Sequence, residues 1–207
     1  MRKLILMCFL GTALAQGQPQ RPLRGQTLVS RQLPAARFTL SKHFHYVGGQ
    51  VINLYGNAEA EQHLFLNTQN GLVESFCWLQ FEHFLPSNKM KYDYGTERSV
   101  KIGDLNFVYD VKAYSDYPGL TMNDPGSDGT AIAQLAAAHH FSFPKRVARV
   151  RMFFLPTPDR RTELMIIYGE AVKWNVPADR VSLDENQADV AKTIVEHVRE
   201  NITIHAF

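Results

Sequence analysis

One stretch of the chain, residues 72–85, limits the possible folds more than any other. Alternate residues fall on two sides of an extended strand, one with Ser75, Cys77, Leu79 and Phe81 and the other with Phe76, Trp78, Gln80, Glu82 and Phe84. Both sides are apolar, so both must be covered, and the pattern predicts the central strand of a sheet with material packed on each face. Gln80, Glu82 and His83 lie near one end, where buried polar groups need partners.

The first fifteen residues have the three parts of a secretory signal peptide. Arg2 and Lys3 precede an apolar run from Leu4 to Leu14, which ends in Ala13-Leu14-Ala15. A run of small residues after an apolar core is typical of a cleavage site. The run is shorter than the roughly 20 residues that cross a bilayer. We therefore expect cleavage near Ala15 and an extracytoplasmic protein, periplasmic or secreted, without a transmembrane segment.

Composition restricts the partners of the mature chain. The 22 lysines and arginines fall to 20 without Arg2 and Lys3, which equals the number of acidic residues. This balance gives no charge argument for binding nucleic acid or an anionic membrane. Cys77 is then the one remaining cysteine, so no disulfide can form within the chain, and its apolar surroundings predict a buried structural thiol. No motif calls for a cofactor.

The rest of the chain divides into an N-terminal arm and one domain. Residues 16–36 contain three prolines and no usable period, which predicts a flexible arm. Strand patterns follow near 37–46, 50–55, 61–67, 72–85, 100–102, 105–115, 146–155 and 163–172, and residues 117–129 read as a long loop. Residues 37–207 thus predict a single α+β domain, with about seven mostly antiparallel strands in a curved or barrel-like sheet.

Two helices are expected to pack against this sheet. The alanine-rich segment 131–140 predicts a short helix capped by Asp128 or Thr130. Residues 182–185, Ser-Leu-Asp-Glu, form a capping box that opens a C-terminal helix with an apolar stripe. That stripe must bury against something, so we expect the C-terminal helix to cover one face of the sheet.

The dipeptide Asn70-Gly71 sets the pairing of the two longest strand patterns, because it is a strong signal for a two-residue hairpin turn. A regular hairpin places Phe65 opposite Phe76 and His63 opposite Trp78. One face then combines aromatic with hydrogen-bonding side chains, namely Glu61, His63, Phe65, Phe76, Trp78, Gln80 and Glu82. This grouping depends on the register, since a slip of one residue moves a whole strand's side chains to the opposite face.

The mixed face has the composition of a pocket wall, mostly apolar with a few converging polar groups. We therefore predict a binding module for a small, partly apolar ligand. Alternatively, Glu82 and His63 form an acid-base pair in a small hydrolase or isomerase. Partial burial would raise the pKa of the carboxylate, so that either Glu82 or His63 could serve as a general base near neutral pH. A third hypothesis is an envelope interaction protein with no pocket, whose sheet edge or N-terminal arm docks another chain. The plain structural alternative for the mixed face is that Glu61 and Glu82 lie at strand ends in water and His63 stacks on Trp78.

Other chemistry finds little support in the sequence. Two carboxylates and a histidine, Glu61, Glu82 and His63, can ligate a divalent metal. The three come together only through the assumed register, so we predict no metal site. The chain has no Gly-x-Ser-x-Gly elbow, phosphate-binding glycine loop, His-Glu-x-x-His motif or paired cysteines.

Overall fold

The computed structural model describes residues 17–95, 98–176, 178–183 and 188–207, so the predicted signal peptide lies outside the described residues. The described strands are β1 (Leu23–Arg24), β2 (Thr27–Ser30), β3 (Ala36–Leu40), β4 (His45–Leu54), β5 (Ala58–Gln69), β6 (Leu72–Phe84), β7 (Ser99–Ile102), β8 (Leu105–Tyr114), β9 (Val147–Phe154), β10 (Thr162–Ala171), β11 (Arg180–Ser182) and β12 (Ile202–Ala206). The described helices are α1 (Tyr117–Thr121), α2 (Asp128–Ala138) and α3 (Ala188–Asn201).

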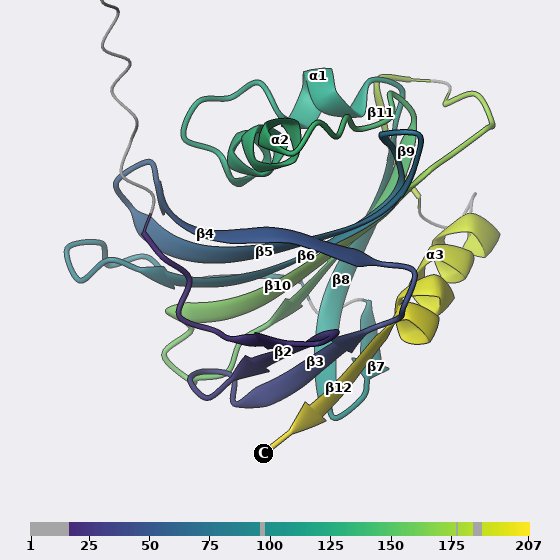
Figure 1. The fold of residues 1–207 in the computed structure, drawn as a ribbon. Helices are drawn as coiled ribbons and strands as arrows, with labels where there is room; N and C mark the ends of the chain where they lie inside the picture. Colours follow the sequence, from purple (N-terminus) through teal and green to yellow (C-terminus); the bar gives the residue numbers. More distant parts are fainter. Residues whose placement is uncertain (1–16, 96–97, 177, 184–187) are drawn as a thin grey trace, which may run out of the picture.

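The strands form two sheets stacked on one another (Figure 1). The large sheet has eight antiparallel strands in the order β11-β8-β9-β10-β6-β5-β4, with β7 paired to β8. It curves but stays open, since β11 and β4 end the order without pairing to each other. The small sheet has the order β1-β2-β3-β12. The α+β class with a mostly antiparallel, curved sheet is confirmed, although the sheet has more strands than predicted.

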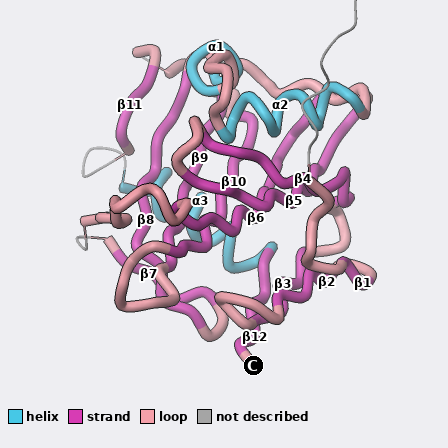
Figure 2. The backbone as a smooth tube through the Cα atoms, turned by 90° about the vertical axis from the view of Figure 1, so that its left-hand side faces the viewer, coloured by secondary structure: helices cyan, strands magenta, loops and turns pink. Residues whose placement is uncertain are grey.

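The large sheet has two covered faces (Figure 2). Helices α1 and α2 lie over one face, which we call the helix face. The small sheet and α3 cover the other, which we call the small-sheet face. Strand β6 runs through the interior of the sheet between β10 and β5, as the two apolar sides of residues 72–85 predicted.

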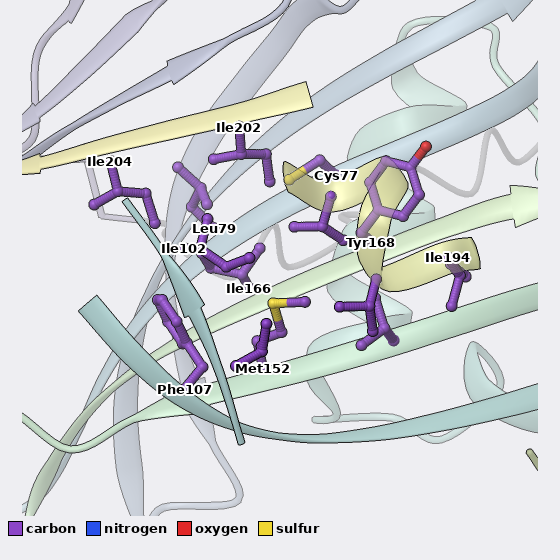
Figure 3. Close-up of a cluster of buried hydrophobic side chains, with 14 of the residues drawn as sticks. Cys77, Leu79, Ile102, Phe107, Met152, Ile166, Tyr168, Ile194, Ile202 and Ile204 are labelled. Atoms are coloured by element: carbon purple, nitrogen blue, oxygen red, sulfur yellow. The ribbon is translucent and has the colours of Figure 1, made fainter. Parts of the chain in front are cut away.

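The core on the small-sheet face joins residues from distant parts of the chain (Figure 3). Cys77 and Leu79 of β6 lie with Ile202 and Ile204 of β12 and with Ile194 of α3. All five are at most 2% exposed. Cys77 is fully buried as predicted, and burial raises the pKa of its thiol, which keeps it protonated and unreactive.

The hairpin between β5 and β6 has the predicted turn. Asn70 and Gly71 have φ values of 51° and 80°, the left-handed conformations that such a turn requires. Gln69 then pairs with Leu72, as a regular hairpin demands. A β-bulge follows between Asn67 and Thr68, and it leaves Glu74 exposed. Beyond the bulge, every pairing between β5 and β6 is shifted by one residue relative to a regular hairpin.

The predicted register beyond the turn is therefore wrong. Phe65 pairs with Cys77 and not with Phe76, and His63 pairs with Leu79 and not with Trp78. The bulge inserts one residue into β6, which turns its side chains to the opposite faces relative to those of β5. The seven residues predicted on one face divide into Glu61, His63 and Phe65 on the small-sheet face and Phe76, Trp78, Gln80 and Glu82 on the helix face.

The N-terminal part of the domain also differs from the prediction. Residues 16–36, predicted as a flexible arm, contain β1 and β2, because Leu28 is fully buried and ties this segment to β3. The pattern at 37–46 is divided between β3 and β4, which belong to different sheets. The chain turns at Ser41, whose carbonyl accepts a hydrogen bond from the Phe44 amide at 3.1 Å.

The helices differ from the prediction mainly at their starts. Helix α2 is capped by Ser127, which accepts a hydrogen bond from the Thr130 amide at 3.2 Å, so neither Asp128 nor Thr130 is the cap. The predicted loop at 117–129 contains α1. Ser182 ends β11, whereas the rest of the predicted capping box, beyond Leu183, lies outside the described residues. Helix α3 covers the small-sheet face, as its apolar stripe required.

Candidate functional site

The polar residues buried on the small-sheet face form a closed network around Glu61. Its carboxylate accepts hydrogen bonds from the Gln20 and Arg21 amides at 3.1 and 2.8 Å and from the Arg21 guanidinium at 2.6 Å. His63 Nε2 lies 2.8 Å from the same carboxylate. Burial acts to raise the pKa of Glu61, but the hydrogen bonds from His63 and Arg21 and the positive charge of Arg21 outweigh it and lower that pKa.

His63 is held at both ring nitrogens. Its Nδ1 lies 3.1 Å from the Tyr46 hydroxyl, opposite the contact with Glu61. Gly49 makes room for this contact, because a Cβ there would stand 2.7 Å from that hydroxyl. His63 is fully buried, and its two polar atoms are occupied. This network anchors the segment at residues 20–21 to the sheet.

The structure separates the predicted acid-base pair. Glu82 projects onto the helix face, whereas His63 projects onto the small-sheet face. The two side chains thus have the sheet between them and cannot act on one substrate, which corrects the predicted Glu82–His63 pair. The same separation removes the metal set of Glu61, His63 and Glu82. Within the described parts of the chain, no group of three or more His, Cys, Asp or Glu is placed to hold a metal ion.

A ladder of amide side chains crosses the helix face. Gln50 donates to Gln62, Gln62 to Gln80, and Gln80 to Glu82, each at 2.8 Å. Tyr92 donates to the other oxygen of Glu82 at 2.7 Å. The first member, Gln50, has a buried Oε1 with no hydrogen-bond partner among the described residues. The ladder connects α2 to the sheet, since Gln62 also donates to the Asp128 carbonyl at 3.2 Å.

A second buried carboxylate stands directly across from Glu82. Glu163 of β10 is its register partner, and Tyr94 donates to Glu163 at 2.6 Å. Burial, with the nearby charge of Glu82, raises the pKa of Glu163 to about 8. Burial also raises the pKa of Glu82. Two such groups side by side do not both ionise at neutral pH, so the pair retains a proton.

A pocket of about 260 Å³ lies on the helix face beside α1 and the start of α2. We call it the basic pocket because four of its lining residues are cationic. It is lined by Trp78, Lys112, Tyr114, Thr121, Asp128, Gly129, Arg149, Arg151, Ile167 and Arg180. Its floor is formed by five neighbouring strands of the large sheet, which lie in the order β6, β10, β9, β8 and β11.

Arg149 is the unusual member of the basic pocket. It is only 8% exposed, and its Nε has no hydrogen-bond partner among the described residues. Its guanidinium carbon lies 4.9 Å from the centre of the Tyr114 ring and 6.0 Å from that of Tyr117. No carboxylate of the described chain pairs with it within 4.0 Å. A buried cation without an anionic partner is costly to maintain.

Two further donors near Arg149 are buried and unpartnered. These are the indole N–H of Trp78, which lines the basic pocket, and the hydroxyl of Tyr117, neither of which has a hydrogen-bond partner in the described part of the chain. Burial raises the pKa of Tyr117 to about 12, so its hydroxyl keeps its proton. Buried polar atoms in folded proteins are nearly always satisfied. The Trp78 indole lines the basic pocket and the Tyr117 ring faces Arg149, so these donors gather around the Arg149 guanidinium.

A larger hollow of about 720 Å³ opens at the end of the large sheet, and it is lined by residues that include Arg21, Glu61 and Arg161. Its two arginines are already engaged. Arg21 bonds Glu61, and Arg161 donates to the carbonyls of Leu85 and Met90 at 3.0 Å. The smaller basic pocket is the better candidate, because its donors remain free among the described residues.

Sequence reasoning found one side of the basic pocket and missed the other. Trp78 was predicted, whereas the cations of β8, β9 and β11 were not. The sequence does show Arg149 and Arg151 alternating with apolar residues, a pattern typical of strand arginines that pair with carboxylates. In the structure Arg151 binds Asp110, and Arg149 has no such partner.

Comparison with known proteins gives no independent guide to function. No protein-family model, curated protein or solved structure matches this chain. In the part of the chain that the structure describes, no helix combines the length and apolar character needed to span a membrane. The geometry of the basic pocket is therefore the guide to function.

Proposed function

We propose that the protein is a binding module for a small, partly apolar ligand, which it holds in the basic pocket between the large sheet and helices α1 and α2. The proposal depends chiefly on Arg149, a nine-tenths-buried side chain whose Nε lacks a partner among the described residues. A ligand that accepts hydrogen bonds would satisfy Arg149 and the Trp78 indole together. Trp78 and Ile167, which are register partners on β6 and β10, supply an apolar wall.

The ladder of amide side chains supports this role by fixing the surroundings of the pocket. The hydrogen bond from Gln62 to the Asp128 carbonyl holds the first turn of α2, which lines the basic pocket, against the sheet. Fixed surroundings reduce the entropy lost when a ligand binds. Phe76, Gln80 and Glu82, predicted as pocket residues, support the site from outside and do not line the basic pocket.

Native mass spectrometry of the purified mature chain, residues 16–207, tests the proposal. A ligand retained from the source appears as an extra mass that is lost on denaturation, and we expect Trp78→Ala to reduce it. Glu59→Gln serves as the control, since Glu59 is exposed and does not line the basic pocket. The proposal fails if the native protein carries no extra mass and if no small molecule tested changes the fluorescence of Trp78.

The predicted signal peptide implies that this binding takes place outside the cytoplasm. We include an extracytoplasmic location, periplasmic or secreted, in the proposal, on the basis of the leader-like run at residues 2–15. N-terminal sequencing of protein recovered from the extracytoplasmic fraction should begin at Gln16. Recovery of uncleaved chain in the cytoplasm would contradict the proposed location without affecting the binding site.

A further inference from the structure

The charges around the basic pocket are unevenly distributed, and they specify more than a generic ligand. Four cations line it, and among the described residues only Arg151 is paired, through hydrogen bonds of its Nε to both oxygens of Asp110 at 3.1 and 3.2 Å. Lys112, Arg149 and Arg180 form no ion pair within the described residues. Asp128 is the one carboxylate in the lining.

Among the described residues, counting these groups leaves a surplus of two positive charges. Of the carboxylates, Asp110 offsets Arg151, and Asp128 offsets one further cation although its Oδ1 already accepts from the Gly129 amide at 2.7 Å. Two cations remain without a counter-charge. The pKa of Lys112 is lowered by burial and by the nearby Arg151, Arg149 and Arg180, against the effect of Asp110, which agrees with an excess of positive charge.

The surplus charge is concentrated on one side of the pocket. Lys112 of β8 stands directly opposite Arg149 of β9, and Arg180 of β11 pairs with Tyr114, two residues beyond Lys112. Register partners and their diagonal neighbours are within side-chain reach of one another. The other side, on β10 and β6, carries Ile167 and Trp78. The pocket therefore has a cationic side on β11, β8 and β9 and an apolar side on β10 and β6.

We propose that the ligand is a small organic phosphate monoester, whose dianionic phosphate is held by Arg149, Lys112 and Arg180 and whose apolar body lies against Trp78 and Ile167. The proposal builds on the binding function above and specifies its ligand class. A phosphate monoester carries both charges on one group, as the clustered cations require, whereas a dicarboxylate separates them. Arginine also matches phosphate with paired, parallel hydrogen bonds.

A series of three benzene derivatives tests the charge of the ligand with the shape nearly constant. Phenyl phosphate carries close to two negative charges at pH 7.5, benzenesulfonate carries one, and benzamide carries none. The protein should carry Trp174→Phe, because the chain has two tryptophans and Trp78 is then the only fluorescent one. Trp174 packs against the core of the small-sheet face, away from the basic pocket.

We expect phenyl phosphate to bind at least about tenfold more tightly than benzenesulfonate, and benzamide to bind most weakly, in low salt. Arg149→Met should weaken phenyl phosphate binding by tenfold or more, and Arg149→Lys should weaken it less because the charge remains. Arg146→Met is the matched control, since Arg146 lies just before β9 and is exposed. The Arg146→Met variant should bind phenyl phosphate with the affinity of the parent protein.

Each other outcome overturns a definite part of the account. If benzamide binds as tightly as phenyl phosphate with a change in Trp78 fluorescence, the phosphate proposal fails and the binding function survives. If phenyl phosphate binds but Arg149→Met and Arg146→Met weaken it equally, the anion is held elsewhere. If none of the three compounds binds and the native protein carries no extra ligand mass, both proposals fail. Circular dichroism of each variant establishes that it is folded.

Discussion

The two faces of the large sheet bury similar kinds of polar group and treat them in opposite ways. On the small-sheet face, Glu61, His63 and Arg21 satisfy one another within 2.6 to 2.8 Å. On the helix face, Arg149 and the Trp78 indole are buried without partners among the described residues. Glu61 and His63 are as deeply buried as Arg149 and Trp78, so burial alone does not distinguish the two faces. The comparison shows that an unmet hydrogen bond is a better sign of a ligand site than a buried charge.

This difference follows from what each network does. The Glu61 network fastens residues 20–21 to β5, so its contacts are made within the chain and are complete. The basic pocket retains a charge that the described chain does not balance, which costs stability in the absence of a ligand. A protein that keeps such a cost is expected to recover it on binding. Mutations on the two faces should therefore affect stability in opposite directions.

Breaking the closed network should have the largest effect. Glu61→Ala leaves the Arg21 charge and the His63 ring without their partner, and removing one member of a buried ion pair costs about 3–5 kcal/mol. We expect urea unfolding to show a loss of this size while phenyl phosphate affinity is retained. Glu59→Ala, an exposed neighbour on the same strand, should change little. A loss below about 1 kcal/mol would mean that the network is not structural.

The buried pair Glu82 and Glu163 should make stability depend on pH. The pKa of Glu163 is raised from 4.5 to about 8, so the folded state binds more protons than the unfolded state between these values. The contribution of Glu163 to the free energy of unfolding is full below pH 4.5 and is lost as the pH rises to 8. The loss amounts to a few kcal/mol, at about 1.4 kcal/mol for each unit of pKa. Glu163→Gln should flatten this decline, measured by urea unfolding at pH 5 and pH 8. An equal decline in Glu163→Gln and in the parent would assign the pH dependence to other groups.

Removing the unpaired charge should stabilise the free protein. Arg149→Met replaces a buried cation with an apolar side chain of similar length, and so removes the cost of burying a charge that has no ion-pair partner among the described residues. We expect a rise in the melting temperature without ligand, together with the loss of phosphate binding. A clear fall in stability would show that Arg149 is compensated within the chain, and the contrast between the two faces would disappear.

Deleting Glu74 should have the smallest effect. The bulge residue is exposed, and its removal would join Val73 directly to Ser75 while each keeps its partner on β5. A regular two-residue hairpin results, so we expect a change in unfolding free energy within about 1 kcal/mol and no change in the basic pocket. A large loss would indicate that the bulge itself, and not the packing of the two faces, fixes the register of β5 and β6.

That bulge also marks the limit of what the sequence could predict. The central position of β6, the buried thiol of Cys77 and the turn at Asn70-Gly71 follow from local pattern, and the structure confirms them. The bulge at Glu74 leaves no local signal, because an exposed glutamate fits a regular strand equally well. One unpredicted residue was enough to place His63 and Trp78 on opposite faces.

The basic pocket was hidden for a different reason. Its residues come from five strands and from helices α1 and α2, and the strands adjoin only after β8, β9 and β10 have taken their places in the sheet. Lys112 and Arg149 are neighbours through pairing across 37 positions of sequence, which no periodicity reveals. The alternating arginines at 149 and 151 were the available signal. Their meaning depended on which one Asp110 would pair with.

One measurement tests the central claim most directly, namely ¹H–¹⁵N correlation spectra of the labelled protein titrated with phenyl phosphate. The account predicts that the side-chain N–H signals of Trp78 and Arg149 shift as they gain a hydrogen-bond partner, while the backbone amides of Glu61 and His63 stay in place. Shifts confined to Glu61 and His63, with Trp78 and Arg149 unchanged, would contradict the account and move the binding site to the small-sheet face.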